Sequence, residues 1–187
     1  INADAYIMES ARTKKRAHFL EEERPIGIQI VGSDIQKLQK AAIKVEKELN
    51  PDIIDINLGC PAYNVMKTGS GSSILKDIRK LALIVNTISS SIEIPLTCKI
   101  RILPDDNDTL KAAKIIEKSG AALLTVHGRT AGQGYGGKAN WNIIKQIKDN
   151  LNIPVVLNGD IIDEESAKKA FDISGCDAIM IGRAAIG

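Results

Sequence analysis

The feature that most constrains the fold is a regular alternation of short apolar runs with longer segments of helical periodicity. Between the runs lie stretches such as residues 34–49, in which Leu38, Ala42 and Val45 fall on one face of a helix. This alternation predicts parallel strands joined by crossover helices. The candidate strands are seven runs rich in β-branched residues, at 5–8, 26–31, 53–58, 95–101, 122–128, 154–160 and 178–183.

Two architectures accommodate such a repeat, an open doubly wound sheet and a closed (β/α)8 barrel. The blocks "GAALLTV" and "GCDAIMI" each enter a strand through glycine and a small residue, which is typical of repeated βα units. No Gly-rich dinucleotide fingerprint follows the first strand. We therefore predict an α/β fold, a (β/α)8 TIM barrel over residues 1–187, with the open sheet as the alternative. Because the seven runs are one short of eight, we expect the first strand to be absent.

Composition narrows the class of protein further. The chain has 187 residues, 44% of them hydrophobic, which is enough for one domain with a real core. Three widely spaced cysteines fit neither a disulfide framework nor zinc-ligand spacing, so we expect no metal site and a reducing, cytoplasmic location. No apolar run approaches the roughly 18 residues of a membrane span. A monomer is compatible with these features, but the sequence does not fix the oligomeric state.

The charge balance does not by itself indicate a nucleic-acid partner. Lysine and arginine number 25 against 23 acidic residues, which gives a formal charge of +2, so any basic surface must be local. The segment "ARTKKRAHF" at 11–19 is the clearest basic cluster. It fits either a patch that contacts a nucleic-acid backbone or a solvated helix face.

Polar residues gather at one end of the predicted strands. In a (β/α)8 barrel this is the catalytic face, where the loops that follow the strands converge. The alternative is that strand ends are polar only because they are solvated, but that does not explain Lys99 and Gln29 inside apolar runs. We therefore expect one shared site formed by Gln29, Asn57, Cys60, Lys99, Arg101, His127, Arg129, Asn158, Asp160, Gly182 and Arg183.

Glycines after the last two strands indicate a phosphate site. Gly159 and Gly182 follow these strands, where many barrels bind phosphate through backbone amides, and Arg183 adds a cation. Taken one at a time, the two glycines could also be ordinary turn residues.

Lys99 near the end of a strand suggests an anionic partner such as a reduced flavin, or a lysine whose ammonium group reaches solvent. His127 fits a donor to an electron-rich ring, or a satisfied core histidine.

Cys60 lies between glycine and proline after the strand at 53–58, at the start of a long loop rich in glycine and serine. Such a loop at a barrel mouth is a candidate cover for a substrate. A free cysteine is often an inert, buried thiol, and we interpret Cys98 and Cys176 in this way. The position of Cys60 beside Asn57 and Gly59 on the predicted catalytic face instead favours a chemical role.

Together these motifs resemble one family. The segments "DINLGCPAYNVMKTGSGSSILKD", "CKIR", "TVHGRTAGQGYGGKANW", "VVLNGDI" and "MIGRAAIG", in this order and with "IGIQIVGSD" upstream, are similar to those of the tRNA-dihydrouridine synthases. The resemblance implies an enzyme that reduces uridine to 5,6-dihydrouridine in tRNA with FMN, itself reduced by NADPH or NADH. It also implies hydride transfer from the flavin N5 to uracil C6 and proton transfer from Cys60 to C5 on the opposite side, as general acid.

The resemblance carries over residue by residue. It makes Gln29, Lys99 and His127 ligands of the flavin, and it makes Asn57, Lys67 and Arg129 contacts of the substrate. The phosphate end of FMN would be held by Asn158, Gly159, Asp160, Gly182 and Arg183. The target base must leave its stack to reach a flavin inside a barrel, so base flipping or a distorted tRNA loop is expected.

The chain departs from the family pattern in three places. The proline-containing first strand has no counterpart, the helical domain that usually follows the barrel is missing, and "KIRILPDDND" replaces the usual glycine and tryptophan after Arg101. We therefore expect a barrel domain that is incomplete at both ends. Two other functions stay open, another FMN barrel oxidoreductase such as a dihydroorotate dehydrogenase-like enzyme, and a non-catalytic RNA-binding barrel. The sequence does not identify the tRNA position that is reduced.

Overall fold

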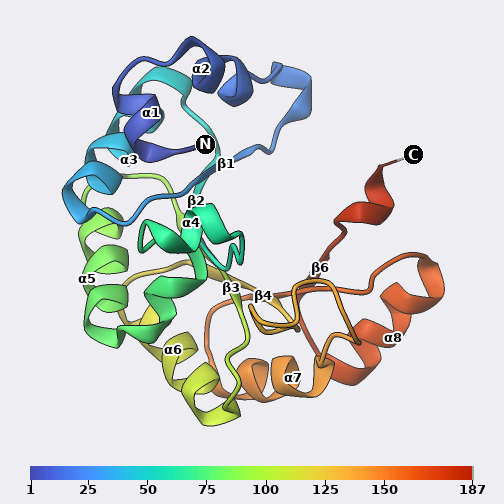
Figure 1. Cartoon of the computed structure of the whole chain (residues 1–187). Helices are drawn as coiled ribbons and strands as arrows, with labels where there is room; N and C mark the ends of the chain where they lie inside the picture. Colours follow the sequence, from blue (N-terminus) through green and yellow to red (C-terminus); the bar gives the residue numbers. More distant parts are fainter. Residues whose placement is uncertain (187) are drawn as a thin grey trace.

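The computed structural model describes residues 1–186. It contains a single sheet of six parallel strands that follow one another in chain order (Figure 1). Because the order never reverses, the sheet has no switch point of the kind that defines a doubly wound fold. The strands are β1 (Gly27–Ile30), β2 (Ile53–Leu58), β3 (Leu96–Arg101), β4 (Leu123–His127), β5 (Val155–Asn158) and β6 (Ala178–Met180).

Helices connect the strands and lie along the outer side of the sheet, so that the molecule forms an arc of a barrel (Figure 1). This arrangement confirms the predicted TIM-barrel class. The α-helices are α1 (Ala3–Ile7), α2 (Ala11–Ala17), α3 (Ile35–Leu49), α4 (Tyr63–Lys67), α5 (Ile78–Ser89), α6 (Asp106–Lys118), α7 (Trp141–Asn150) and α8 (Glu164–Ser174). Three short 3₁₀ helices are η1 (Glu21–Glu23), η2 (Gly71–Lys76) and η3 (Arg183–Ala185).

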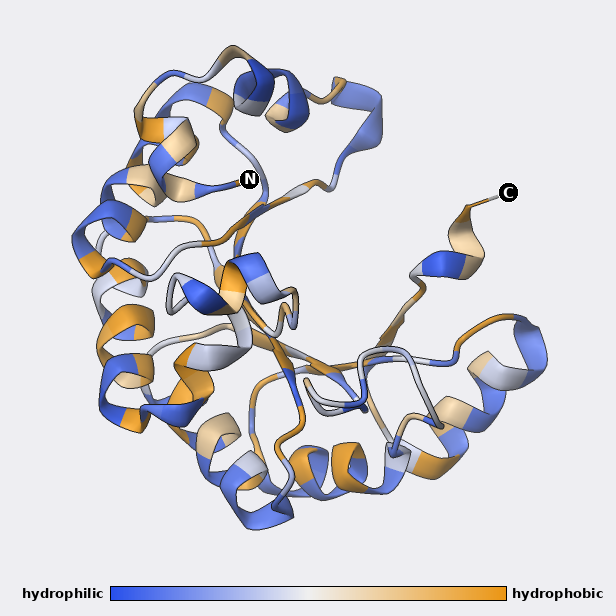
Figure 2. Cartoon of the chain, viewed as in Figure 1, coloured by the Kyte–Doolittle hydropathy of each residue, from blue (hydrophilic) through white to orange (hydrophobic). Residues whose placement is uncertain are grey.

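The core lies between the outer face of the sheet and the inner faces of the helices. On β2, Ile54, Ile56 and Leu58 point toward the helices and are fully buried, as expected from the period of two in a strand. Figure 2 shows apolar colouring along the strands and polar colouring on the outer helical surface. Cys98 and Cys176 are both buried, in agreement with the sequence interpretation.

Side-chain caps explain where the five long helices begin. In each case an Asp or Asn side chain accepts hydrogen bonds from backbone N–H groups of the first turn, which are otherwise unpaired. Each such cap is worth about 1 kcal/mol. The capping residues are Asp34, Asp77, Asp105, Asn140 and Asp163, for α3, α5, α6, α7 and α8 in turn.

The prediction of a strand at residues 5–8 is wrong, because these residues belong to α1 and the turn after it. Ala3 and Tyr6, three positions apart, are buried on one face, and the Asn2 side chain caps the helix by accepting from Ala5 N–H. A four-residue apolar run is too short for periodicity to separate strand from helix. The described residues therefore contain six strands instead of seven, with an isolated parallel bridge between Asn2 and Val31 beside β1.

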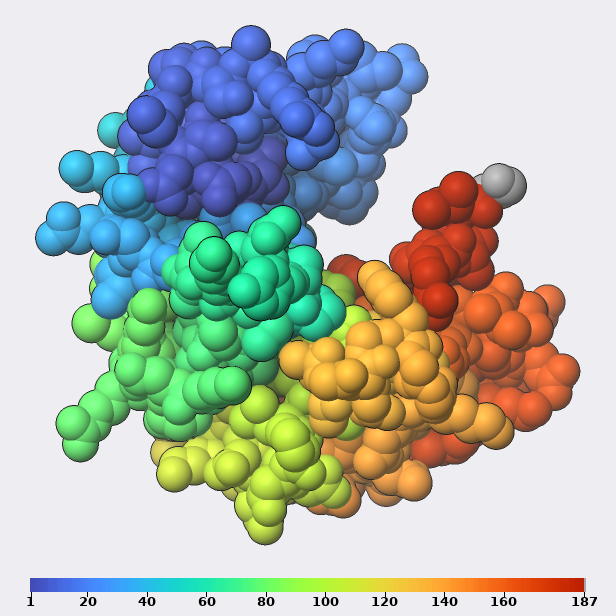
Figure 3. Space-filling model, viewed as in Figure 1, coloured from blue at the N-terminus to red at the C-terminus, as the bar shows by residue number. Residues whose placement is uncertain are grey.

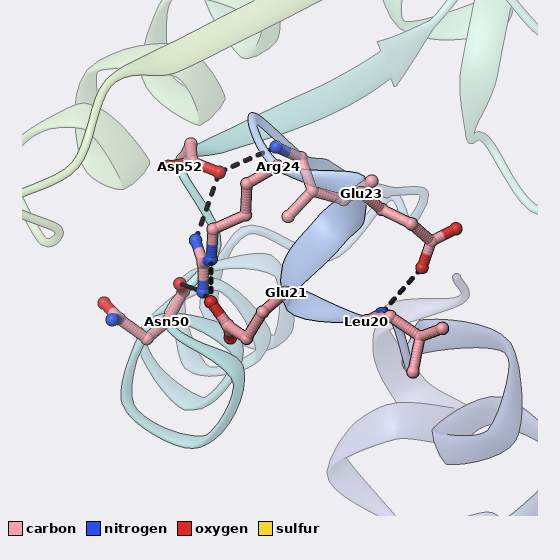
Figure 4. A network of polar contacts seen from close by, with 7 residues as sticks. Leu20, Glu21, Glu23, Arg24, Asn50 and Asp52 are labelled. Carbon is pink, nitrogen blue, oxygen red and sulfur yellow. Dashed lines mark hydrogen bonds and ion pairs between the residues drawn. The ribbon is translucent and has the colours of Figure 1, made fainter.

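The amino-terminal edge of the sheet is fastened by a network around Arg24 (Figure 4). The Arg24 guanidinium donates to Glu21 Oε2 at 2.7 Å, to Asn50 O at 2.9 Å and to Asp52 Oδ2 at 3.1 Å. Asp52 Oδ2 also accepts from Ile26 N–H at 2.7 Å. These contacts connect the segment before β1 with the turn between α3 and β2. They lie at the amino ends of the strands, whereas the polar residues lie at the carboxyl ends.

None of the helices in the described residues 1–186 combines the length and the apolar character needed to cross a membrane. The same residues hold no group of three or more His, Cys, Asp and Glu side chains placed to bind a metal ion.

Candidate active site

A cavity of about 760 Å³ opens at the carboxyl ends of the strands. In the space-filling view, α4 and the loop between β4 and α7 flank the centre of this face (Figure 3). The cavity collects residues from all six strands or the loops that follow them. Among its lining residues are almost all of the predicted site residues, namely Gln29, Asn57, Cys60, Lys99, Arg101, His127, Arg129, Asn158, Gly159, Asp160, Gly182 and Arg183.

Lys67 is the exception among the predicted site residues. It is exposed at the end of α4 and does not line the cavity. The basic segment at 11–19 forms α2, which packs against α1, and none of its described residues lines the cavity. Lys14 of this segment pairs with Glu9. Gly187, the last residue of the motif "MIGRAAIG", lies outside the described residues.

Sequence reasoning missed Tyr135 and Met180, which also line the cavity. Tyr135 is in the loop after β4, and its side chain is 63% exposed. The Arg183 guanidinium lies 4.6 Å from the centre of the Tyr135 ring, and the Arg101 guanidinium lies 5.7 Å from it. Both distances are within the range of a cation–π contact. The aromatic residue between glycines in "GQGYGG" was the only sequence signal for this arrangement.

The backbone of Cys60 is held on both sides. Asn57 Oδ1 accepts from Cys60 N–H at 2.9 Å and from Gly59 N–H at 3.2 Å. The carbonyl of Cys60 accepts from the N–H and from the hydroxyl of Ser72, both at 3.1 Å. The thiol itself is partly exposed at the cavity wall. The loop predicted after Cys60 thus contains α4 and η2, and its role as a mobile cover stays a prediction.

Gly59 cannot carry a side chain in this arrangement. A Cβ atom at this position would lie 2.9 Å from the carbonyl carbon of Ile100 and 3.0 Å from the backbone nitrogen of Arg101. Both atoms belong to β3 and cannot move aside without disturbing the sheet. The requirement for glycine before Cys60 therefore comes from close contact between two neighbouring strands.

Lys99 points to the interior side of the sheet, together with Thr97 and Arg101. Its Nζ donates to Asn158 Oδ1 at 3.0 Å, and Asn158 Nδ2 donates to Met180 O at 2.9 Å. Burial lowers the pKa of Lys99 to about 8, with a smaller opposing effect from Asp55 and a further lowering by Arg101. The ammonium is therefore mainly charged at neutral pH, and an anionic ligand in the cavity would stabilise it.

His127 at the end of β4 is uncharged at neutral pH. Its pKa is lowered to about 4, mainly by burial and also by the nearby cations Arg101, Lys99 and Arg129, against a smaller opposing effect of Asp160. Its Nε2 atom is buried and has no hydrogen-bond partner within the described part of the chain. Buried polar atoms are nearly always paired, so Nε2 is a candidate contact for a ligand of the cavity.

Gly159 follows β5 and lies against His127. Its φ of +113° is in the region that favours glycine, and a Cβ there would lie 3.0 Å from His127 Cδ2 and from Ala139 Cβ. Its carbonyl accepts from Trp141 Nε1 at 3.1 Å. The backbone after β5 can therefore approach a ligand closely only because residue 159 lacks a side chain.

Arg129 and Asp160 form an ion pair in the cavity wall. Arg129 Nη2 donates to Asp160 Oδ1 at 2.6 Å, and Asp160 Oδ2 accepts from Ala139 N–H at 2.7 Å. Burial alone would raise the pKa of Asp160, but the hydrogen bonds from Ala139 and Arg129 outweigh it and hold that pKa below its ordinary value. The two side chains thus connect the loop after β4 to the turn after β5.

The fold and the cavity together define an α/β barrel protein with a candidate ligand site at the carboxyl ends of its strands. The residues that line this site include cationic side chains, amide donors and one thiol. The chain belongs to the family described as dihydrouridine synthase (Dus), whose model matches residues 1–187.

Curated relatives agree with this assignment. The chain is 38% identical over 186 residues to a probable tRNA-dihydrouridine synthase of Rickettsia conorii, covering 98% of this chain and 56% of the relative. It is 35% identical to tRNA-dihydrouridine synthase B of Proteus vulgaris and 38% identical to tRNA-dihydrouridine synthase B of Pseudomonas aeruginosa, each over the whole of this chain. These two matches cover 58% and 57% of the relatives. The chain thus spans a little more than half the length of the relatives it matches.

Solved structures with much lower sequence identity share the fold. The structure of DHODH in complex with ferulenol from Eimeria tenella matches with a TM-score of 0.67 at 16% identity, over 94% of this chain and 58% of that one. A putative racemase from Roseobacter denitrificans matches with a TM-score of 0.61 at 11% identity, over 86% of this chain and 41% of that one. At these identities the likeness concerns the fold alone.

Proposed function

We propose that this chain supplies the catalytic barrel of a tRNA-dihydrouridine synthase, which reduces uridine to 5,6-dihydrouridine in tRNA. The observation that supports this most strongly is the convergence of a backbone-anchored thiol, Cys60, with Lys99 and the unpartnered His127 Nε2 in one cavity. Family membership and the names of the relatives point in the same direction. We place the activity in the cytoplasm, and a monomer is compatible with this proposal.

FMN fits the chemistry of the cavity residues. An electron-rich ring with a phosphate arm needs cations and N–H donors, which Lys99, Gln29 and His127 offer on one side and Arg183 on the other. Gly159 allows the backbone to approach closely, and Gly182 has no atom within 4 Å of the position of a Cβ. We therefore assign Gln29, Lys99 and His127 to the ring and Asn158, Gly159, Asp160, Gly182 and Arg183 to the phosphate arm.

The role of Asp160 in this assignment comes from its backbone. Its carboxylate already accepts hydrogen bonds from Ala139 N–H and from Arg129. A carboxylate that faced a phosphate would also repel it. Asp160 adopts a φ of +59°, directly after Gly159 at +113°, so that the two residues form a tight turn at the predicted phosphate end.

When bound and reduced by NADPH or NADH, FMN would supply a hydride for uracil C6. The protein's own contribution is to hold the base and to deliver a proton to C5. Cys60 offers a transferable proton at the cavity wall, and its backbone is fixed by donating to Asn57 Oδ1 and accepting from Ser72. The thiol must remain protonated until transfer, which distinguishes it from a nucleophilic cysteine.

The three residues proposed to contact the substrate differ in their positions and in the hydrogen-bonding groups that they leave free. Asn57 lines the cavity and retains one N–H donor, because its Nδ2 makes a single hydrogen bond, to Gln29 Oε1 at 2.7 Å. Such a donor suits a carbonyl oxygen of uracil. Lys67 is exposed on α4 and suits a tRNA phosphate. Arg129 lines the cavity, and its Nη1 has no hydrogen-bond partner among the described residues, so we keep it as a substrate contact while its other nitrogens hold the loop after β4.

Mass spectrometry of tRNA from cells that lack the full-length protein tests this proposal. Loss of dihydrouridine at a defined position, restored by the wild-type gene and not by Cys60→Ala, is the expected result. Unchanged dihydrouridine in a strain without other synthases contradicts it. Turnover of a free pyrimidine without RNA would instead indicate a dihydroorotate dehydrogenase-like enzyme. Absence of flavin absorbance near about 370 and 450 nm after FMN addition would indicate a non-catalytic RNA-binding barrel.

A further inference from the structure

A continuous series of hydrogen bonds runs from Asp55, inside the barrel, to the backbone of Cys60. Asp55 Oδ2 accepts from Gln29 Nε2 at 2.6 Å. Gln29 Oε1 accepts from Asn57 Nδ2 at 2.7 Å. Asn57 Oδ1 then accepts from Cys60 N–H at 2.9 Å and from Gly59 N–H at 3.2 Å. Asp55 has no place among the predicted site residues and does not line the cavity.

The register of the sheet explains why these side chains meet. Gln29 on β1 is the parallel partner of Asp55 on β2, and Asp55 is the partner of Thr97 on β3. Asp55 and Asn57 are two positions apart, so both point to the interior side. Thr97 Oγ1 donates to the other carboxylate oxygen, Asp55 Oδ1, at 2.7 Å.

Which group donates and which accepts in each hydrogen bond of the series is set by Asp55, where the series begins. Both Asp55 oxygens act as acceptors, so Gln29 must turn its amide nitrogen toward Asp55 and its oxygen toward Asn57. Asn57 must in turn present nitrogen to Gln29 and oxygen to the Cys60 loop. If either amide were reversed, oxygen would face oxygen or N–H would face N–H at these distances.

The same orientation leaves donors in the cavity. Each amide nitrogen carries two N–H groups, and Gln29 and Asn57 each use one within the series. Since both residues line the cavity, the remaining N–H groups are available to ligand acceptors. Burial raises the pKa of Asp55 above its ordinary value, and the hydrogen bonds from Thr97 and Gln29 and the charge of Lys99 offset this only in part.

We propose that Asp55 is a positioning residue that acts through Gln29 and Asn57 to fix the Cys60 loop and to orient the two free amide donors of the cavity. The catalytic consequence rests on the proposed function, but the effect on Cys60 does not. Removal of the Asp55 carboxylate frees Gln29 to rotate, which weakens the anchor of Asn57 on Cys60 N–H. The Cys60 backbone then opens locally more often, and the thiol becomes more reactive toward an external reagent.

The direct test is the rate of Cys60 alkylation by iodoacetamide in the full-length protein, followed by peptide mass spectrometry. Cys98 and Cys176 are buried and serve as internal references. We expect Asp55→Ala and Gln29→Met to raise the Cys60 rate by about threefold or more. Thr97→Val is the matched control, because it removes the other partner of Asp55 without breaking the series, and it should stay within a factor of about two.

Gln29→Met keeps the test decisive if Asp55→Ala does not fold, because it breaks the same series with an apolar side chain of similar length. Folded variants with wild-type melting temperatures and wild-type Cys60 rates would overturn the proposal. An equal rise in Thr97→Val would also overturn it, because the effect would then come from general loosening of the barrel.

Steady-state turnover on tRNA separates this inference from the proposed function. In an active wild-type enzyme, Asp55→Ala should lower kcat by about tenfold or more with little change in KM for tRNA, because proton delivery depends on Cys60 placement. A wild-type kcat in Asp55→Ala overturns the positioning role and leaves the proposed function intact. A wild-type enzyme that reduces no uridine refutes the proposed function, and the alkylation rates still decide the role of Asp55.

Discussion

The Arg129 guanidinium donates to Asp160 Oδ1 at 2.6 Å, with only 3% of the Arg129 side chain exposed. The same guanidinium donates to Gly136 O at 3.0 Å and to Gly137 O at 2.6 Å. Arg129 therefore holds the loop after β4 in its observed shape from within. That loop carries Tyr135 to the cavity, so the shape of one cavity wall depends on this contact between the buried Arg129 and the partly exposed Asp160.

Replacement of Arg129 by lysine should destabilise the protein strongly. A lysine cannot reproduce the planar fork that contacts two carbonyls and a carboxylate, and it leaves Asp160 incompletely paired, at a cost of about 3 kcal/mol. Urea unfolding followed by circular dichroism measures the change. Arg79→Lys, at an exposed position on α5, is the matched control and should change stability by less than about 0.5 kcal/mol. Equal stability of the two variants would refute a buried clamp.

FMN affinity should depend on the charge of Lys99. Since its pKa is lowered to about 8, the ammonium is lost as the pH rises through that value, and the affinity of the wild-type protein for FMN should fall there. Lys99→Gln should bind FMN about tenfold more weakly at pH 7, with a flat profile up to about pH 9. Fluorescence titration of the flavin measures both effects. If Lys99→Gln kept the pH dependence of FMN affinity seen in the wild-type protein, Lys99 would be excluded as the titrating group. Lys118→Gln on α6 serves as the control.

His127 should make the protein sensitive to acid. Its pKa is lowered from 6.5 to about 4 in the folded state, so the unfolded chain takes up the proton first as the pH falls. The resulting loss of stability is absent above pH 6.5 and reaches about 3 kcal/mol near pH 4. His127→Gln should lose correspondingly less stability than wild type between about pH 7.5 and pH 4 in urea unfolding. His18→Gln, at an exposed position outside the cavity, is the matched control.

Gly159→Ala should disturb the predicted phosphate end. The added Cβ would contact His127 and Ala139 at 3.0 Å, and the φ of +113° is unfavourable for alanine. We expect a destabilisation of about 1–3 kcal/mol together with weaker FMN binding. Gly132→Ala in the loop after β4 is the control, because its Cβ would meet only one atom, at 3.9 Å. Normal FMN affinity in Gly159→Ala would contradict close approach of this backbone to the cofactor.

Cys60→Ala should separate chemistry from cofactor binding. The variant should retain FMN, because the predicted flavin ligands lie on other strands, while uridine reduction falls by about a hundredfold or more through loss of the general acid. Flavin absorbance and dihydrouridine analysis of tRNA report the two properties independently. Cys60→Ser should be similarly slow, since a hydroxyl is a far weaker acid than a thiol. A variant that unfolds and loses FMN would instead identify Cys60 as a structural thiol.

Much of the fold was predictable from local patterns. The strand at 53–58 and the helix at 34–49 agree with β2 and α3, because alternation and helical spacing report burial directly. The gathering of the polar residues in one cavity was predictable as well, since carboxyl ends of parallel strands meet at one edge whatever the intervening sequence. The run at 5–8 was assigned wrongly because its four residues satisfy either period until the packing of Tyr6 selects a helix.

The sequence by itself therefore determined the βα repeat, the edge at which the site forms and the residue types available there, because each depends on local spacing. Only the tertiary structure decided what the polar groups do. Arg129 and Asp160, 31 residues apart, form an ion pair that joins two loops of the cavity. Asp55 is hydrogen-bonded to Gln29 and Thr97, 26 and 42 residues away. Hydrogen-bond direction depends on which neighbour the sheet register supplies, and that register exists only in the folded chain.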